Sequence, residues 1–482
     1  MSVYQTVDND YDNQLGSSKF FSHGESKTCR NILIIATVST GGIFMGYYMT
    51  ILNSMADPLF VGVYGMSIDE KSSTAGDANM LFSIGCLIGA LITGKISESI
   101  GRRKFTIILD VSMVAVSLMY LIKDIYVFYF ARFLSGIVSL AGYSLCTILN
   151  AEILPRKLAT MGNAIAQLVL LSSVFLSYIQ QNLFSRQFLI DNWRYVMTWL
   201  VIVFTIKLIA FPFIVRIDTA KYYISKNSEA PDLDERLREL FLYTHRESEI
   251  PEAISQCKII YAREKEIRSG NATKILTAKT IRKRLIAGIL VGQAQQLSGQ
   301  PYLGFYSTDL FNRISGNGKQ VTFYLAIAKV VGGLTAVFAI KFIGRKKNLL
   351  GGILGQGISL AMMVTSVMTG IPIFSYVAAF SFMSAFAVGV GGSFYVFLNE
   401  ILPPIGVSVS GTLLWLSNSI VSKVLPIAAK AFGDEALLIF YSACCFVLFF
   451  ILDYFIIETR GKSEKQILDE YETKPYRPLD FS

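Results

Sequence analysis

The sequence predicts an all-α membrane protein of twelve transmembrane helices, arranged as two six-helix pseudo-repeats joined by a cytoplasmic linker of short helices. Three observations support this fold class. The 482 residues are 52% hydrophobic and only 16% charged, with a mean hydropathy of +0.48, which is too apolar for an ordinary soluble chain. Long apolar stretches recur along the chain, and two short motifs each occur twice.

The apolar stretches are long enough to cross a membrane, because a helical span needs about 20 predominantly apolar residues. Helices are expected since lipid offers no hydrogen-bond partner to backbone amides and carbonyls. Six stretches precede the polar segment 217–283 and six follow it. The twelve expected spans are roughly 31–53, 79–97, 104–122, 125–149, 159–182, 195–216, 284–310, 320–343, 347–369, 373–399, 406–430 and 436–457.

The repeated motifs indicate a tandem duplication. Gly-Arg-Arg-Lys at 101–104 is echoed by Gly-Arg-Lys-Lys at 344–347, 243 residues later. Glu-Ile-Leu-Pro at 152–155 returns unchanged at 400–403, 248 residues later. Two echoes at nearly one spacing, each beside apolar spans, predict that the second half repeats the first. A duplicated membrane-embedded unit favours transport over chemistry.

Positive charge defines the expected topology. Segment 216–284 alone holds fifteen Lys and Arg, and the loops after spans 2, 4 and 8 add more. Because Lys and Arg mark the cytoplasmic side, both termini are expected to be cytoplasmic, and the plasma membrane is the expected location. The formal net charge of +9 then follows from topology, so no nucleic-acid partner is expected.

This topology divides the chain into five parts. The first is a tail without the apolar core of a signal peptide, and the third alternates Glu and Arg at helical spacing, as expected of short, solvent-exposed amphipathic helices. The parts are 1–30, a cytoplasmic tail; 31–216, a six-helix bundle; 217–283, the cytoplasmic linker; 284–460, the second bundle; and 461–482, a second tail.

Neither an enzyme nor a metal centre is predicted. The six cysteines are scattered and the two histidines lie in polar segments, so no disulfide framework or metal cluster is indicated. There is no phosphate-cradling loop and no nucleophile with a histidine partner. We expect no cofactor, and we expect the protein to work as a monomer in the lipid bilayer.

Several motifs in order resemble the major facilitator superfamily and, within it, the sugar porters. The resemblance covers about residues 31–465. It implies the superfamily fold and a carrier that moves a small solute by alternating access, with a site near the midplane between the two halves. The motifs are Gly94–Arg103, Arg132–Gly136, Glu152–Pro155, Gln167, Trp193–Arg194, Gln295–Gly299 and Glu458–Gly461.

The resemblance implies salt bridges at the cytoplasmic ends of the spans. In this family such arginine–carboxylate pairs hold the cytoplasmic side shut and break when it opens. A surface pair contributes only about 0–1 kcal/mol, which suits a contact that must reopen. The residues so assigned are Glu98, Arg102, Arg103, Glu152, Arg345 and Glu400; because Lys341 replaces the acid of the second loop, Arg345 is expected to rely on Glu400 alone.

Span 7 is the expected substrate segment. Its amide side chains are costly in lipid and must face protein or a wet cavity, and Pro301 interrupts the helix that carries them. Amides both donate and accept hydrogen bonds, as a polyhydroxylated solute requires; the alternative is hydrogen bonding between helices. The expected substrate contacts are Gln167, Gln295, Gln296, Lys329, Tyr395 and Asn418, with Tyr47, Tyr302, Phe305 and Tyr306 as further aromatic faces or ordinary packing.

Lys329 departs from the family pattern, because it falls where sugar porters place a sugar-binding asparagine. A lysine inside a span is a functional candidate by default; it could bind an anionic or carbonyl-bearing solute, titrate during transport, or snorkel to the membrane surface. Lys423 would add weight if both lysines faced one cavity. Two solute classes therefore remain open: a hexose or similar small polar solute, and an organic anion or acidic sugar read by Lys329.

The coupling mechanism depends on span 1. Proton-coupled relatives carry Asp directly after the Gly-Tyr of this span, whereas this chain has Tyr48 after Gly46 and Tyr47. Arg132, the usual partner of that Asp, then lacks an acid and is the remaining coupling candidate. Facilitated diffusion is therefore favoured over proton symport, with Asp110 and Asp453 interpreted as structural. A non-transporting nutrient sensor is a further alternative, disfavoured by the short tail after Gly461.

Overall fold

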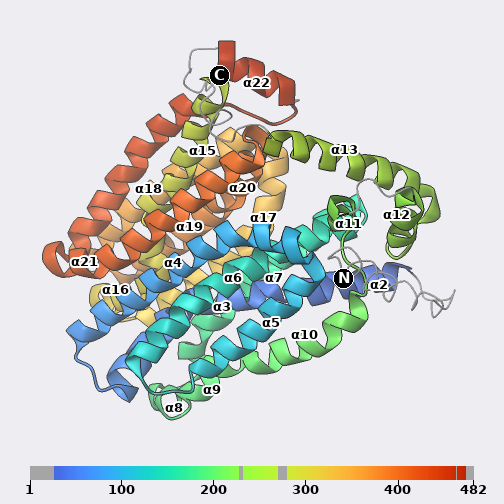
Figure 1. The fold of residues 1–482 in the computed structure, drawn as a ribbon. Helices are drawn as coiled ribbons and strands as arrows, with labels where there is room; N and C mark the ends of the chain where they lie inside the picture. The colour runs from blue at the N-terminus through green and yellow to red at the C-terminus, as the bar shows by residue number, and fades with distance from the viewer. Residues whose placement is uncertain (1–26, 227–231, 270–278, 463, 474–482) are drawn as a thin grey trace.

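The computed structural model describes residues 27–226, 232–269, 279–462 and 464–473. Within these residues every regular element is helical. The helices formed by the apolar spans pack side by side, and buried apolar side chains fill the spaces between them. Figure 1 shows two helical bundles that meet at one end of the molecule, with the helices of the linker at the other end.

The first half contains spans 1 to 6. Span 1 is split into two α-helices and a terminal π-helix, and span 6 into two helices. In chain order the elements are α2 (Lys27–Ser39), α3 (Gly41–Ala56), η2 (Asp57–Val63), α4 (Ile68–Ile100), α5 (Arg102–Met119), α6 (Ile125–Ile153), α7 (Arg156–Leu183), α8 (Arg186–Asp191), α9 (Trp193–Thr198) and α10 (Leu200–Ile214).

The second half contains spans 7 to 12, and the linker lies between the halves. The linker elements are α11 (Ala220–Lys226), α12 (Leu233–Leu242), η3 (Glu247–Glu249) and α13 (Ile250–Ser269). The second half comprises α15 (Lys279–Leu297), α16 (Gln300–Ser315), α17 (Gly318–Phe342), α18 (Arg345–Thr369), α19 (Pro372–Val388), α20 (Val390–Ile401) and α21 (Pro404–Phe455), followed by α22 (Glu464–Thr473).

The count of twelve spans is consistent with this structure. Eight continuous helical stretches are long and apolar enough to cross a membrane, and one of them, Ile405–Phe455, is 51 residues long. It holds two spans, because Gly433 leaves the helical conformation (φ 83°, ψ 160°) and turns the chain back. Helix α5, the pair α15 and α16, and helix α17 supply the remaining three.

The second span starts earlier than the sequence predicts. Helix α4 begins at Ile68 rather than near 79, so it is 33 residues long. Its first turn is closed by a capping box, in which Ser67 Oγ accepts from the Glu70 amide and Glu70 Oε2 accepts from the Ser67 amide. The early residues include Lys71 and Asp77, whose charges lower the hydropathy there; both are paired across the bundle, as shown below.

The linker is docked on the first half rather than fully exposed. Its α12 buries Leu237, Leu240 and Phe241, which is the apolar face of an amphipathic helix. Side chains at the start of α2 hold the segment after α12 through its carbonyls: Asn31 Nδ2 donates to Thr244 O at 2.9 Å and Lys27 Nζ to His245 O at 2.8 Å. The first half and much of the linker therefore form one packed body.

Candidate substrate site and the contacts between the halves

The seventh span breaks where the sequence predicts. Helix α15 ends at Leu297, Gly299 adopts a left-handed conformation (φ 81°), and α16 restarts at Gln300 with Pro301 in its first turn. The restart brings α16 against the first half. Gly304 O accepts hydrogen bonds from Tyr178 Oη at 2.6 Å and from Asn53 Nδ2 at 3.0 Å.

Asn53, at the end of α3, is the most connected side chain in this contact. Its Nδ2 also donates to Ser307 Oγ at 2.8 Å, and its Oδ1 accepts from the Thr308 amide at 3.1 Å and from Thr308 Oγ1 at 2.8 Å. Asn53 is 7% exposed. One buried amide thus makes four hydrogen bonds from the first half to α16, and the sequence analysis did not single it out.

Three ion pairs join the halves beside this contact. They connect the first three turns of α4 with α16 and with α21, and each places a lysine against an aspartate. The pairs are Lys71–Asp309 at 2.9 Å, Lys430–Asp69 at 2.9 Å and Lys423–Asp77. We call this end of the bundle, where the cross-half hydrogen bonds and ion pairs gather, the closed end; the opposite end, beside α11 to α13, is the linker end.

Lys423 is therefore committed to Asp77 of the first half. In the sequence analysis Lys423 carries weight only if it faces one cavity with Lys329, and the structure gives it a carboxylate partner at the contact between the halves. That partner lies 346 residues away in the chain, so nothing local to span 11 indicates it.

Two of the predicted substrate contacts are joined in a chain that crosses the interface. Asn418 Nδ2 donates to Gln296 Oε1 at 2.9 Å, and Asn418 Oδ1 accepts from Ser83 Oγ at 2.7 Å. Ser83 belongs to α4 of the first half, whereas Asn418 and Gln296 belong to the second. All three are almost fully buried, so in this state they hold helices together as well as offering polar atoms at the interface.

Gln167 and Tyr395 are exposed between the halves. Gln167 Oε1 accepts from Tyr143 Oη at 2.5 Å. Tyr143 lies within electrostatic range of Tyr395 in the second half, and Tyr395 within range of Cys86 in the first. Tyr395 nonetheless exposes 49% of its surface. A half-exposed ring with neighbours from both halves lies on an inner wall of the bundle.

Gln295 is partly buried on α15. Among the described residues its side chain makes no hydrogen bond, so both its amide atoms are available to a ligand. The neighbouring Gln293, by contrast, accepts from Ser417 Oγ at 2.6 Å. Span 7 therefore carries an uncommitted amide, Gln295, between two that are bonded to span 11.

Most of the other candidate aromatics are packing residues. Tyr47, Tyr302, Phe305 and Tyr306 are buried. The hydroxyl of Tyr47 donates to Val196 O at 2.6 Å, that of Tyr306 to Ser422 O at 3.0 Å, and that of Tyr302 to the Asp434 carboxylate. Of the five candidates, Tyr395 is the one with an exposed ring.

Lys329 lies near the centre of α17, whose 25 residues run from 318 to 342. It is 7% exposed. Among the described residues its ammonium makes neither a hydrogen bond nor an ion pair. The structure thus places this side chain inside the protein rather than at a membrane surface.

The first basic loop is held by two carboxylates. Arg102 Nε lies 3.1 Å from Glu152 Oε2, as expected. The second acid, Asp218, was missed: its Oδ1 and Oδ2 accept from the Arg102 and Arg103 amides, both at 3.1 Å. Burial raises the pKa of Asp218, against the effect of these amides. Among the described residues the Arg103 side chain donates to carbonyls such as Val215 O (2.7 Å) and to no carboxylate.

The second loop repeats this arrangement: the Arg345 side chain pairs with Glu400, and a second carboxylate, Glu458, binds the backbone amides of the loop. Arg345 Nη2 lies 2.6 Å from Glu400 Oε1. Glu458 Oε1 and Oε2 accept from the amides of Arg345 at 2.9 Å and Lys346 at 3.2 Å. Gly344 and its counterpart Gly101 have φ values of 98° and 95°, which only glycine adopts readily.

The two salt bridges, Arg102–Glu152 and Arg345–Glu400, each join helices of the same half. Neither of them connects one half to the other. Glu98 lies in the last turn of α4, partly buried. The side chain of Lys341 lies outside the described residues. A signal for the missed acids was present: Asp218-Thr219 and Glu458-Thr459 lie 240 residues apart, close to the spacing of the other repeats.

Arg132 is fully buried, and no carboxylate among the described residues pairs with it. Its Nη1 donates to Tyr48 O at 2.6 Å and its Nη2 to Asn79 Oδ1 at 3.2 Å, and its guanidinium lies 4.6 Å from the centre of the Phe82 ring. Carbonyl, amide and aromatic ring replace the missing carboxylate of span 1. The carbonyl and the amide accept hydrogen bonds from the guanidinium, and neither of them takes up a proton.

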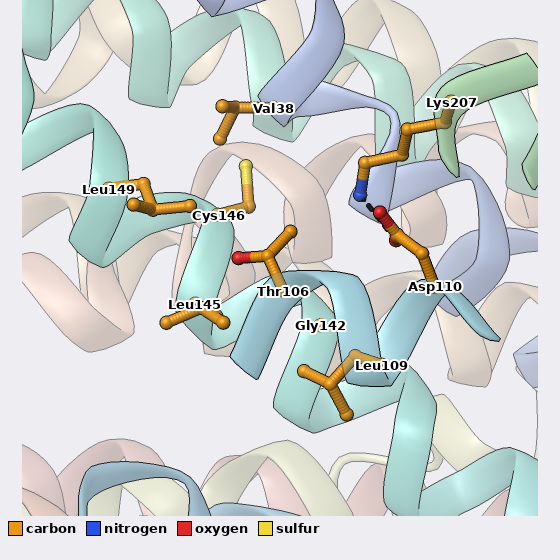
Figure 2. A pocket seen from close by; sticks show the side chains of 9 residues that line it. All are labelled: Val38, Thr106, Leu109, Asp110, Gly142, Leu145, Cys146, Leu149 and Lys207. Carbon is orange, nitrogen blue, oxygen red and sulfur yellow. Dashed lines mark hydrogen bonds and ion pairs between the residues drawn. The ribbon is translucent and has the colours of Figure 1, made fainter. Parts of the chain in front are cut away.

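A small pocket inside the first half is too small to hold a solute. Figure 2 shows Lys207 of α10 reaching Asp110 of α5 beside Cys146; the Lys207 Nζ to Asp110 Oδ1 distance is 2.7 Å. The cavity volume is about 10 Å³, room for about one water molecule. Asp110 is thus paired within its own bundle, in agreement with its structural interpretation, and Asp453 pairs likewise with Lys346 at 2.8 Å.

A larger cavity, of about 500 Å³, lies between the beginnings of α17 and α19. Its lining includes Tyr324, Ile373 and Val377, which are each more than 40% exposed. All its lining residues belong to the second half. An alternating-access site is lined by both halves of the transporter. This cavity is lined by one half only and is bordered by exposed apolar side chains, so it does not fit such a site.

Two six-helix halves, closed against each other at one end and lined by polar side chains between them, define a membrane transporter rather than an enzyme. The chain belongs to the family described as "Sugar (and other) transporter", whose model matches residues 34–471. The major facilitator fold and the sugar-porter resemblance are thereby confirmed.

Known relatives match most of the chain at low identity. The probable metabolite transport protein CsbC of Bacillus subtilis is 25% identical over 459 residues, covering 92% of this chain and 94% of that protein. The glucose transporter GlcP of Staphylococcus epidermidis is 24% identical over 456 residues, with 92% and 97% covered. Human facilitated glucose transporter member 7 of solute carrier family 2 is 22% identical, with 90% and 89% covered.

Solved structures share the fold. The xylose transporter XylE from E. coli in a partially occluded inward-open conformation superposes with a TM-score of 0.75 at 19% identity, covering 90% of this chain and 100% of that one. The proton:xylose symporter XylE bound to 6-bromo-6-deoxy-D-glucose gives 0.74 at 17% identity, with 92% and 100% covered.

Proposed function

We propose that the protein carries a sugar, a hexose or a similar small polar solute, across the membrane by alternating access and without proton coupling. The observation that carries this proposal is a set of polar side chains: Gln167 and Tyr395 are exposed between the halves, and Gln295 on α15 has an amide that makes no hydrogen bond among the described residues. Amides that donate and accept match the hydroxyls of a sugar, and an exposed ring offers it a stacking face.

The relatives support the same solute class. Two of the three named above are called glucose transporters, and the symporter structure holds a glucose derivative. In this proposal Gln167, Gln295, Gln296, Tyr395 and Asn418 contact the solute. The bond between Gln296 and Asn418 would then be exchanged for solute contacts as the halves move.

The contacts between the halves support alternation. The closed end is held by hydrogen bonds and ion pairs that must break before it opens. The basic loops at the linker end hold each half together through Arg102–Glu152 and Arg345–Glu400. We propose that these loops, with Glu98 and Arg103, meet across the halves in the opposite state and close the linker end.

The absence of coupling follows from Arg132. A proton-coupled carrier needs a group that takes up and releases a proton during the cycle, and Arg132 is bonded to a carbonyl and an amide instead of a carboxylate. An arginine itself does not titrate in proteins. We therefore propose that the solute moves down its own gradient.

We further propose the cellular arrangement that the charge pattern favours. The basic linker and both termini are cytoplasmic, the plasma membrane is the host membrane, and the monomer is the working unit. With this orientation the linker end is cytoplasmic and the present state faces inward. We also propose that the chain is organised as a tail, a bundle, a linker, a second bundle and a second tail, with boundaries after residues 30, 216, 283 and 460.

Uptake into liposomes tests the proposal. Purified protein is reconstituted and offered labelled sugars and organic acids, with and without a pH gradient. We expect saturable uptake of a sugar that a pH gradient does not drive. Gln295→Ala should raise KM roughly tenfold, the effect of about 1.4 kcal/mol. Gln356→Ala, which removes a buried amide bonded within its own helix, is the matched control.

Two results would contradict the proposal. Accumulation of the sugar against its gradient when the outside is acidified would show proton coupling. Failure to transport any compound of the panel, by protein that is folded and correctly inserted, would favour the non-transporting sensor.

A further inference from the structure

Lys329 differs from the other buried lysines of the described chain. Four lysines are less than 9% exposed. Three of them face an aspartate: Lys71 with Asp309 at 2.9 Å, Lys207 with Asp110 at 2.7 Å, and Lys346 with Asp453 at 2.8 Å. Lys329 has no such partner among the described residues. Of the four buried ammonium groups in the described part of the chain, three are neutralised by an aspartate and the fourth is not.

The position of Lys329 excludes snorkelling. It lies one residue from the midpoint of a 25-residue helix, so each helix end is about 18 Å away at 1.5 Å per residue. A lysine stem reaches only about 6 Å beyond the backbone. The ammonium therefore stays within the membrane-spanning region, where an uncompensated charge costs several kcal/mol.

Helical periodicity shows what Lys329 faces. Ala326 packs against Val174 and Tyr178 of α7, and the Leu171 side chain lies against Gly333. Lys329 is three residues after Ala326 and four before Gly333, so it shares their face. Lys329 therefore points from the second half toward α7 of the first half.

The opposing face of α7 carries a predicted substrate contact. Gln167 lies four residues before Leu171, so it extends the stripe that faces α17. Moreover, the Lys329 ammonium has no partner yet is absent from the fully enclosed polar atoms of the described chain. A small part of it thus reaches accessible space on the side of α17 that faces α7.

We propose that Lys329 binds a carboxylate on the transported solute, so that among the sugars that the site accepts an acidic sugar, such as a hexuronate, is preferred over the neutral hexose. This inference rests on the proposed function, because it takes the space between the halves as the solute site. As in the proposed function, the amide side chains form hydrogen bonds with the hydroxyls of the sugar. The ammonium supplies a charge-assisted hydrogen bond that a neutral sugar leaves unused, and the solute supplies the counter-charge that Lys329 does not find among the described residues.

The test compares glucose with glucuronate, two solutes that differ at one carbon. Binding to the purified protein is followed by thermal shift, and uptake is measured in liposomes at pH 7.5. We expect tighter binding of glucuronate. Lys329→Met should weaken glucuronate binding roughly 10- to 100-fold, the effect of losing one charged hydrogen bond, and should leave glucose binding nearly unchanged. Lys329→Arg should retain most of the preference.

Lys319→Met is the matched control, because Lys319 is an exposed lysine on the same helix; it should bind both solutes like the natural protein. The melting temperature without solute reports whether each variant folds. Binding of glucose but not glucuronate by the natural protein would overturn this inference and leave the proposed function standing. Equal glucuronate binding by the natural protein and by Lys329→Met would do the same. Binding of neither solute would overturn this inference, and failure to transport any compound of the wider panel as well would overturn both.

Discussion

Asn53 offers the sharpest test of how the closed end is held. Its amide makes four hydrogen bonds to Gly304, Ser307 and Thr308, between 2.8 and 3.1 Å long. At a net contribution of about 0.5–1.5 kcal/mol each, they favour the closed end by about 2–6 kcal/mol. When this end opens, water replaces the partners that Asn53 and the α16 groups lose. We therefore use the lower part of this range, about 2–4 kcal/mol. Asn53→Ala should therefore raise the ratio of open to closed molecules roughly 30- to 700-fold.

The distance between the two halves at the closed end measures this ratio. Spin labels are placed at Ser73 and Glu435, exposed positions on α4 and α21, with the native cysteines replaced by serine, and distances are recorded by pulsed electron paramagnetic resonance. Asn53→Ala should populate a longer distance. Asn182→Ala is the control, because Asn182 makes one exposed cross-half bond of 3.3 Å to Lys319 O. An unchanged distance distribution in Asn53→Ala would refute the reasoning.

Three further predictions concern charged groups. Lys423→Asp should open the closed end by setting two carboxylates together, and adding Asp77→Lys should restore closure; the side chains are 35% and 29% exposed, so the coupling should be about 0.5–1 kcal/mol, and an unrestored double variant would count against the pair. Glu458→Ala should destabilise the detergent-solubilised protein by about 1–3 kcal/mol, since two amides lose their acceptor, and Glu458→Gln by less; equal melting of both variants and the natural protein would exclude this role. Burial lowers the pKa of His245 below its ordinary 6.5, with Glu249 opposing and Lys27 adding to the shift. His245 therefore binds a proton more readily when the linker is undocked. The docking of the linker on the first half is thus most stable above pH 6.5 and becomes less stable as the pH falls below that value. Hydrogen exchange of residues 233–250 should thus be faster at pH 5.5 than at 7.5, and His245→Phe should remove that difference.

The fold was predictable because its signals are local. Hydropathy over about 20 residues located the spans, and Pro301 marked the break in span 7, where the structure has a left-handed Gly299. The error at the start of α4 has the same origin. Asp69, Lys71 and Asp77 lower the local hydropathy, and only their partners on α16 and α21 make a helix with these charges stable there.

The sequence predicted which residues belong to the candidate site, but not which of them are hydrogen-bonded to one another. Gln296 and Asn418 were named from span 7 and span 11, yet their hydrogen bond, and the link through Ser83, required the packed helices. Asn53 was not named, because a single asparagine near the end of an apolar span carries no distinguishing pattern. Its importance comes from the four groups around it.

The sequence by itself determined the class of this protein: twelve spans, a duplicated half, basic loops on one side and amides in a broken seventh span. These properties depend on residue type and on neighbours within a few helical turns. Only the tertiary structure decided which charges are neutralised. Lys423 finds Asp77 across 346 residues, whereas Lys329 finds no acid among the described residues. The physical reason is that such pairs depend on the rotation and tilt of helices far apart in the chain, which packing of the whole bundle sets.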